Sequence, residues 1–149
     1  MPRFYYREQL PELFGLDTRC ALEWEALVIG ALTLARIDEE FFVGDGAAAA
    51  LWLYEAASRI GIQVAIVKGA AESGEGRMVR HAWLAYYCGE KAVTFDPWNE
   101  VFGSEDGYGH RQGKIVRPKD AVPFHALPNF EGDDAEDLEE VEQSMREVF

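Results

Sequence analysis

The segment from residue 47 to 61, AAAALWLYEAASRIG, constrains the fold more than any other part of the chain. It is rich in alanine and leucine, which favour helices, and it ends at Gly61, a residue type that commonly terminates helices. Its side chains are apolar nearly all the way round the helix. Because such a helix is stable only when other elements surround it, the sequence predicts a buried central helix.

The elements on either side of this helix indicate the fold class. Residues 17–36 are predicted to form an earlier helix, which Asp17 or Thr18 can cap. Three later stretches are typical of strands, the last two joined by the turn CGEK: 62–69, 78–88 and 91–97. A further short strand is expected at KIVRP. Helices followed by an antiparallel sheet predict an α+β domain.

Length and composition indicate one globular domain with an acidic extension. Of the 149 residues, 48% are hydrophobic, which is enough to build a core. We expect residues 1–130 to form the domain. Residues 131–149 are dominated by acidic side chains, so this C-terminal tail is expected to be either helical or disordered.

Charge and hydropathy exclude several classes of partner. The net charge of −13 would repel phosphate groups, so we expect no nucleic acid and no membrane partner. The start of the chain lacks an apolar signal region, and its most apolar stretch, ALVIGALTLA, is too short to span a bilayer. A cytoplasmic location is therefore expected, and the oligomeric state is left undefined.

The predicted hairpin brings a histidine and an aspartate together. A two-residue turn at residues 89–90 pairs Trp83 with Asp96. Directly paired residues share a face and alternate residues stay on it, so His81 lies diagonally opposite Asp96. A carboxylate that orients an imidazole prepares it to act as a general base. Most such pairs are ordinary surface hydrogen bonds, but Pro97 ends the strand and fixes the position of this aspartate.

From Gly44 to Trp98 the sequence resembles the transglutaminase-like superfamily, which shares the papain-like cysteine protease fold. Three blocks carry the resemblance, in this order: GDGAAAALWLYEAASRIGIQVAIVKG, HAW and FDPW. They are similar to the family's nucleophile helix, histidine block and aspartate block. The resemblance implies that His81 is the base and that Asp96 orients it. It also implies chemistry without a cofactor, in which a thiolate attacks a peptide bond or a glutamine amide to give a thioester.

The family's nucleophile, a cysteine at the N-terminus of the helix, is missing from this chain. Counting back from the Gly61-Ile62 ending places it at Gly46, and the neighbouring register places it at Ala47. Neither residue carries a nucleophilic side chain. Covalent chemistry at this helix is therefore excluded for the sequence as it stands.

Three interpretations of the missing cysteine remain open. The favoured one is a pseudoenzyme whose cleft binds a peptide or protein segment, or a structural part of a larger assembly. In the second, a catalytic cysteine of a peptidase or acyltransferase has been replaced at position 46 or 47. In the third, Cys20 supplies the thiol from the first turn of its own helix, where the helix dipole lowers the pKa of a thiol. A cysteine buried on a helix face is the commoner case.

The remaining candidate residues have structural as well as functional interpretations. Trp83 and Trp98 flank the His–Asp pair, and would either pack in the core or line a substrate groove. The chain's two cysteines are too few for a disulfide framework and lack CxxC spacing. His110 and His125 have no ligand partners at metal spacing, so we expect no metal and no cofactor.

Overall fold

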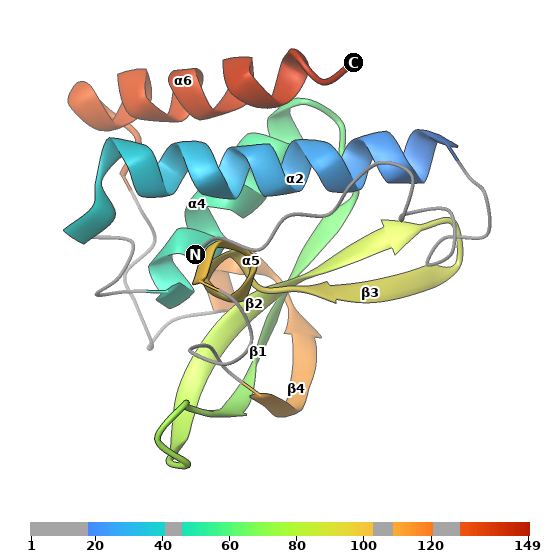
Figure 1. Ribbon diagram of the computed structural model, residues 1–149, viewed down its shortest axis with the longest axis vertical. Coiled ribbons are helices and arrows are strands. Elements are labelled where there is room, and N and C mark those ends of the chain that lie inside the picture. Colours follow the sequence, from blue (N-terminus) through green and yellow to red (C-terminus); the bar gives the residue numbers. More distant parts are fainter. Residues whose placement is uncertain (1–17, 41–45, 103–108, 121–128) are drawn as a thin grey trace.

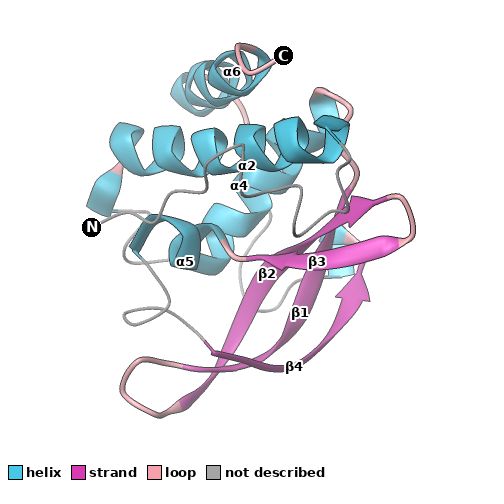
Figure 2. Cartoon of the chain, turned by 45° about the vertical axis from the view of Figure 1, so that its right-hand side comes forward, coloured by secondary structure: helices cyan, strands magenta, loops and turns pink. Residues whose placement is uncertain are grey.

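The computed structural model describes residues 18–40, 46–102, 109–120 and 129–149. They form an α+β fold in which helices gather on one side of an antiparallel sheet (Figures 1 and 2), which confirms the predicted class. The helices are α2 (Thr18–Ile37), α4 (Gly46–Arg59), α5 (Pro97–Phe102) and α6 (Asp133–Arg146), with a short 3-10 helix, η2 (Pro118–Asp120). Among these described helices, none combines the length and the hydropathy needed to cross a membrane.

The sheet has four strands in the order β3-β2-β1-β4, and every neighbouring pair is antiparallel. The strands are β1 (Val64–Glu72), β2 (Met78–Cys88), β3 (Lys91–Phe95) and β4 (Gly109–Val116). β4 begins well before the strand predicted at KIVRP, because the polar residues ahead of it pair with β1. Ala70 pairs with Gln112 and Ala71 with His110, so β4 carries a bulge at Arg111 that shifts the pairing by one residue.

The central helix lies where the sequence predicts it. Nine of the fourteen residues of α4 are buried, among them Leu51 and Leu53, which confirms that this helix is enclosed. It ends at Arg59, and two residues later Gly61 turns the chain with φ of 87°, a left-handed conformation that favours glycine. The N–H of Ile62 then donates to the carbonyl of Ala57 at 3.0 Å, closing the helix and releasing the chain into β1.

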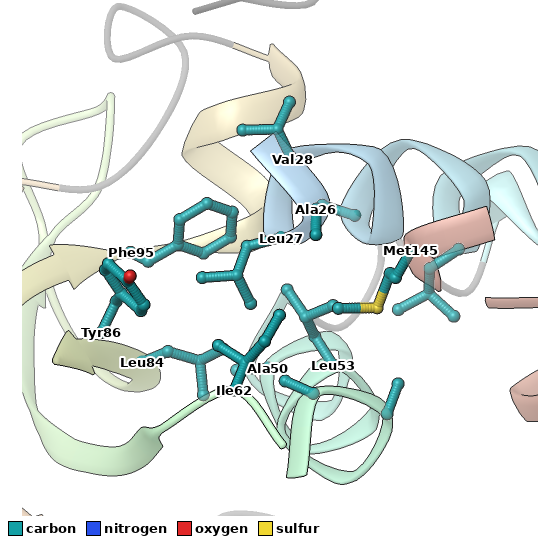
Figure 3. Close-up of a cluster of buried hydrophobic side chains, with 14 of the residues drawn as sticks. Ala26, Leu27, Val28, Ala50, Leu53, Ile62, Leu84, Tyr86, Phe95 and Met145 are labelled. Atoms are coloured by element: carbon teal, nitrogen blue, oxygen red, sulfur yellow. The ribbon is translucent and has the colours of Figure 1, made fainter. Parts of the chain in front are cut away.

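The hydrophobic core fills the space between the helices and one face of the sheet. Figure 3 shows side chains from four sources meeting there: α2, α4, α6 and the inner face of the sheet. The sheet residues are fully buried, with Leu84, Tyr86 and Phe95 each at 0% exposure. Trp24 of α2 packs edge-on against Phe95, with ring centroids 5.0 Å apart.

The acidic C-terminal segment is a helix that belongs to this core. Leu138, Val141 and Met145 of α6 are buried at one-turn spacing, and α6 lies across α2 (Figure 1). Gly30 of α2 allows the close approach, because a Cβ there would lie only 2.7 Å from the sulfur of Met145. Most of the acidic residues of α6 are exposed, whereas the half-buried Glu142 pairs with Arg59 of α4. The helical alternative for residues 131–149 is therefore the one found.

Candidate functional site

The hairpin of β2 and β3 has the register that the sequence predicts. Gly89 adopts φ of 61° in a two-residue turn, which pairs Cys88 with Lys91 and Leu84 with Phe95. One further step along this register sets Asp96 opposite Trp83. His81 therefore lies diagonally opposite Asp96 on one face of the sheet, as expected.

Asp96 holds the junction between β3 and α5 as well as the histidine. Its Oδ1 accepts a hydrogen bond from the N–H of Trp98 at 3.0 Å, and its carbonyl accepts one from Glu100 at 3.0 Å. These bonds make Asp96 the N-cap of α5, with Pro97 in the first helical position, where its missing N–H costs nothing. The predicted strand 91–97 is consequently two residues too long.

The second carboxylate oxygen of Asp96 is directed at His81. The distance between His81 Nε2 and Asp96 Oδ2 is 2.6 Å, and both residues are only 2% exposed. Because the cap fixes Oδ1 and the imidazole contacts Oδ2, neither oxygen of this buried carboxylate lacks a partner. The pair is thus held rigidly inside the protein, which is unlike a surface hydrogen bond.

His110 is a third member of this cluster, and the sequence analysis missed it. Its Nε2 lies 2.9 Å from the same Oδ2 of Asp96. The conclusion that His110 has no ligand partner was wrong, because it considered only spacing along the chain. Pairing of β4 with β1 sets His110 beside Ala71, and from there the imidazole reaches Asp96. His125, named with it, lies outside the described residues.

The two histidines determine the charge state of the carboxylate. Burial alone would raise the pKa of Asp96, but the hydrogen bonds from His110 and His81 outweigh it, and the pKa is held below its usual value of 3.8. Asp96 is therefore a carboxylate at neutral pH. It presents a negative charge to two imidazoles in a nearly water-free setting.

Gly46, the first residue of α4, lies beside this cluster. A Cβ built on it would be 3.4 Å from His81 Cε1 and 3.1 Å from Trp98 Cδ1. A side chain at this position would therefore touch the imidazole from the N-terminal end of a helix. Helix termini of this kind stabilise negative charge, including that of a thiolate.

Cys20 does not supply the missing thiol. Its sulfur is bonded to that of Cys88, 68 residues away, with Cα atoms 5.6 Å apart. The prediction of Cys20 as an alternative nucleophile is therefore wrong for this structure, because a disulfide sulfur cannot act as a thiolate. The chain contains two cysteines and both are used in this bond, so it has no free thiol.

The two tryptophans that flank the pair differ in environment. Trp83 is 4% exposed, packs with Val67 and Ala85, and lies 4.4 Å from the His110 ring, centroid to centroid. It is a core residue, not an open groove wall. Trp98 is half-buried and packs against Phe102, with centroids 4.6 Å apart. Of the two residues predicted to line a substrate groove, only Trp98 keeps appreciable exposed surface.

A hollow of about 670 Å³ lies elsewhere on the sheet. Its charged lining comes from Lys68, Arg80 and Lys114. Arg80 precedes His81 on β2, and successive side chains point to opposite faces of a strand. The hollow therefore opens on the face opposite to the His81 side chain and is not lined by the His–Asp cluster.

The comparisons with known proteins identify no relative: no family model matches the chain, and no curated protein and no solved structure matches it.

Proposed function

We propose that this chain is a transglutaminase-like domain of papain-like fold that has lost its nucleophile and binds a peptide or protein segment instead of cleaving one. One observation carries the proposal. Gly46, where the resemblance places the nucleophile, begins a buried helix, and a Cβ built on it would lie 3.4 Å from His81 Cε1. The His81–Asp96 contact of 2.6 Å supplies the remainder of the arrangement.

The chemistry left to such a site is recognition. Without a thiol, no acyl-enzyme can form and no bond in a substrate is broken. What remains is an oriented imidazole beside the half-buried indole of Trp98 and the first N–H groups of α4. An imidazole and backbone N–H groups can form hydrogen bonds with the amides of a peptide, and an indole ring can pack against its side chains.

Restoring the thiol tests the proposed ancestry directly. The variant Gly46→Cys should react with iodoacetamide near neutral pH about tenfold faster than the same variant carrying His81→Ala, since the imidazole and the helix terminus lower the pKa of the thiol. The wild-type chain has no free thiol and gives the blank.

Ala47→Cys is the matched control for this experiment. It places a thiol on the same helix terminus but turned by about 100° around the axis. Its labelling rate should not depend on His81. If both variants fold and Gly46→Cys is labelled at the same rate with and without His81, the proposed ancestry is contradicted.

Peptide binding is tested with NMR on the EDTA-treated wild-type protein. A mixed library of short peptides should shift the side-chain resonances of His81, and Trp98→Ala should weaken the response. Leu32→Ala, which truncates a half-buried side chain of α2, controls for general destabilisation. Unchanged His81 resonances at saturating peptide would remove the binding function from the proposal.

The same geometry admits an active cysteine peptidase or acyltransferase whose cysteine has been replaced in this particular chain. The codons for positions 46 and 47 in the natural gene decide between the two. A cysteine codon would favour the enzyme, with His81 as base and Asp96 as its orienting residue, whereas codons for glycine and alanine would favour the pseudoenzyme.

The disulfide bears on where this function would operate. The cytoplasmic location expected from the sequence stays a prediction, whereas disulfides persist mainly in oxidising compartments. Alkylation of the protein directly in acid-quenched source cells separates the two cases. Modification of both Cys20 and Cys88 would support the cytoplasm, and modification of neither would contradict it.

A further inference from the structure

We propose that His81, Asp96 and His110 form a binding site for a divalent transition-metal ion such as Zn²⁺. One ligand atom of each residue lies within 4.8 Å of the other two. Both histidines approach Oδ2 of Asp96 through Nε2. This inference goes beyond peptide binding and does not depend on it. It rests on the convergence of three side chains from β2, the β3–α5 junction and β4.

The spacing of the three atoms is close to what a bound ion requires. Two ligands bonded to tetrahedral zinc at about 2.0–2.1 Å lie roughly 3.3 Å apart. In the structure Oδ2 lies 2.6 Å from His81 Nε2 and 2.9 Å from His110 Nε2. Each of these two pairs therefore has to separate by about half an ångström on binding, which side-chain torsions can supply.

The donor set selects a class of metal. Two imidazole nitrogens and one carboxylate oxygen suit zinc, cobalt and iron(II), whereas Ca²⁺ and Mg²⁺ prefer oxygen ligands. The carboxylate of Asp96 offsets part of the charge of the ion. On binding, each Nε2–H···Oδ2 hydrogen bond is replaced by an Nε2–metal bond. The ring proton then resides on Nδ1, or leaves to solvent if the ring was cationic.

The surrounding residues hold the ligands in place. Trp98 N–H fixes the other oxygen of Asp96, which prevents the carboxylate from rotating away. Trp83 lies against both imidazoles, with ring centroids 5.8 Å from His81 and 4.4 Å from His110. A supported site of this kind needs little reorganisation when an ion enters.

The three residues do not complete the coordination shell of a tetrahedral ion. Three protein ligands leave one position of a tetrahedral ion for water or for a group of the bound partner. The His110 side chain is 19% exposed against 3% for His81, so the approach to the ion is from the β4 side. A carbonyl or carboxylate from a peptide is the kind of group that this position accepts.

The test uses the tag-free, EDTA-treated full chain titrated with Zn²⁺ by calorimetry and with Co²⁺ by visible absorption, in excess Mg²⁺ to occupy surface carboxylates. We expect one equivalent of the metal ion to bind per chain. With Co²⁺, the d–d absorption bands of a four-coordinate ion should appear. His110→Ala should weaken binding at least tenfold, and so should Asp96→Asn.

Asp120→Asn is the matched control for Asp96→Asn, because it removes a carboxylate from the exposed end of η2. Its affinity for Zn²⁺ should equal that of the wild type. Circular dichroism establishes that each variant is folded, and His110→Gln replaces His110→Ala if the latter is not. The absence of one-equivalent binding by folded wild type would overturn the proposal, as would equal affinity in the folded His110 and Asp96 variants. Neither result would alter the peptide or thiol experiments.

Discussion

The two faces of β2 lie in different environments, one apolar and one polar. On one face Ala82, Leu84 and Tyr86 are enclosed by α2, α4 and β3 residues in the main core. On the other face His81 and Trp83 meet Asp96 and His110 in a small polar cluster. The side chains alternate between these environments along a single strand.

The difference lies in what stabilises each face. Burial of apolar area is not directional, so the core tolerates any well-packed set of side chains of the right volume. The polar cluster depends on hydrogen bonds whose partners come from three separate segments. A small displacement of one segment leaves a buried charge with fewer partners, which is costly. Substitutions on the first face should therefore mainly change the free energy of unfolding. Substitutions on the second face should mainly change the geometry of the polar cluster and what it can bind.

The largest effect is expected from truncation on the apolar face. Leu84→Ala removes a side chain with 0% exposure and should lower the free energy of unfolding by about 2–5 kcal/mol, measured by urea denaturation. Leu32→Ala, the same change at a half-buried position, should cost clearly less. If the two variants were equally stable, the distinction between buried and half-buried positions of the core would fail.

Loss of the disulfide should have the next largest effect. Cys20 and Cys88 tie α2 to the end of β2 across 68 residues of chain, and the loop-entropy estimate for that length is about 4 kcal/mol. Wild type in dithiothreitol should therefore unfold at lower urea concentration than oxidised wild type. The double variant Cys20→Ala/Cys88→Ala should be insensitive to dithiothreitol. Two free thiols in the oxidised, denatured wild type would show that the bond does not form.

A smaller loss of stability, but a complete loss of the cluster geometry, is expected from Gly69→Ala. A Cβ on Gly69 would overlap the backbone of Gln112 and Gly113 in β4, which cannot move aside as a side chain can. We expect a cost of about 1–3 kcal/mol and displacement of β4, so that His110 leaves Asp96.

Gly109→Ala is the control for this change, since its Cβ would meet only a carbonyl at 4.0 Å. NMR shifts of the His110 ring report the displacement. His110 shifts unchanged in a folded Gly69→Ala variant would show that the cluster does not depend on the β1–β4 contact.

The smallest effect is expected in the pH dependence of the metal-free protein. Because the folded state lowers the pKa of Asp96 below 3.8, the unfolded state binds the proton more readily. The stabilisation is fully present above the unfolded pKa and is lost as pH falls through the lower folded one. Urea unfolding between neutral and acid pH should show a shallower acid loss in Asp96→Asn than in wild type. Asp120→Asn measures the effect of removing one exposed negative charge; an Asp96→Asn profile identical to it would refute the role assigned to the buried carboxylate.

Much of the local structure could be predicted from sequence because it depends on near neighbours. The Gly61 cap, the two-residue turn at Gly89 and the alternation along β2 each follow from a few residues. Together they were enough to predict that His81 and Asp96 share a face. The predicted end of β3 is wrong because Asp96 caps α5, a short helix that the apolar pattern of the strand does not reveal.

The features that the sequence did not reveal are contacts between distant segments. His110 joins Asp96 through the pairing of β4 with β1, and Cys20 meets Cys88 through the packing of α2 on the sheet. No spacing along the chain encodes either contact. The sequence of the C-terminal segment permits a helix with Leu138, Val141 and Met145 on one side as well as disorder, and only the packing of α6 against α2 decides for the helix.

The sequence by itself determined the two long helices, the hairpin register and the absence of a nucleophile at Gly46 and Ala47, since these depend on local backbone preferences and residue identity. Only the tertiary structure decided that both cysteines are oxidised, that His110 completes a three-ligand cluster, and that Gly46 lies against His81. These depend on how the helices and the curled sheet pack, because burial brings together groups that the chain keeps far apart.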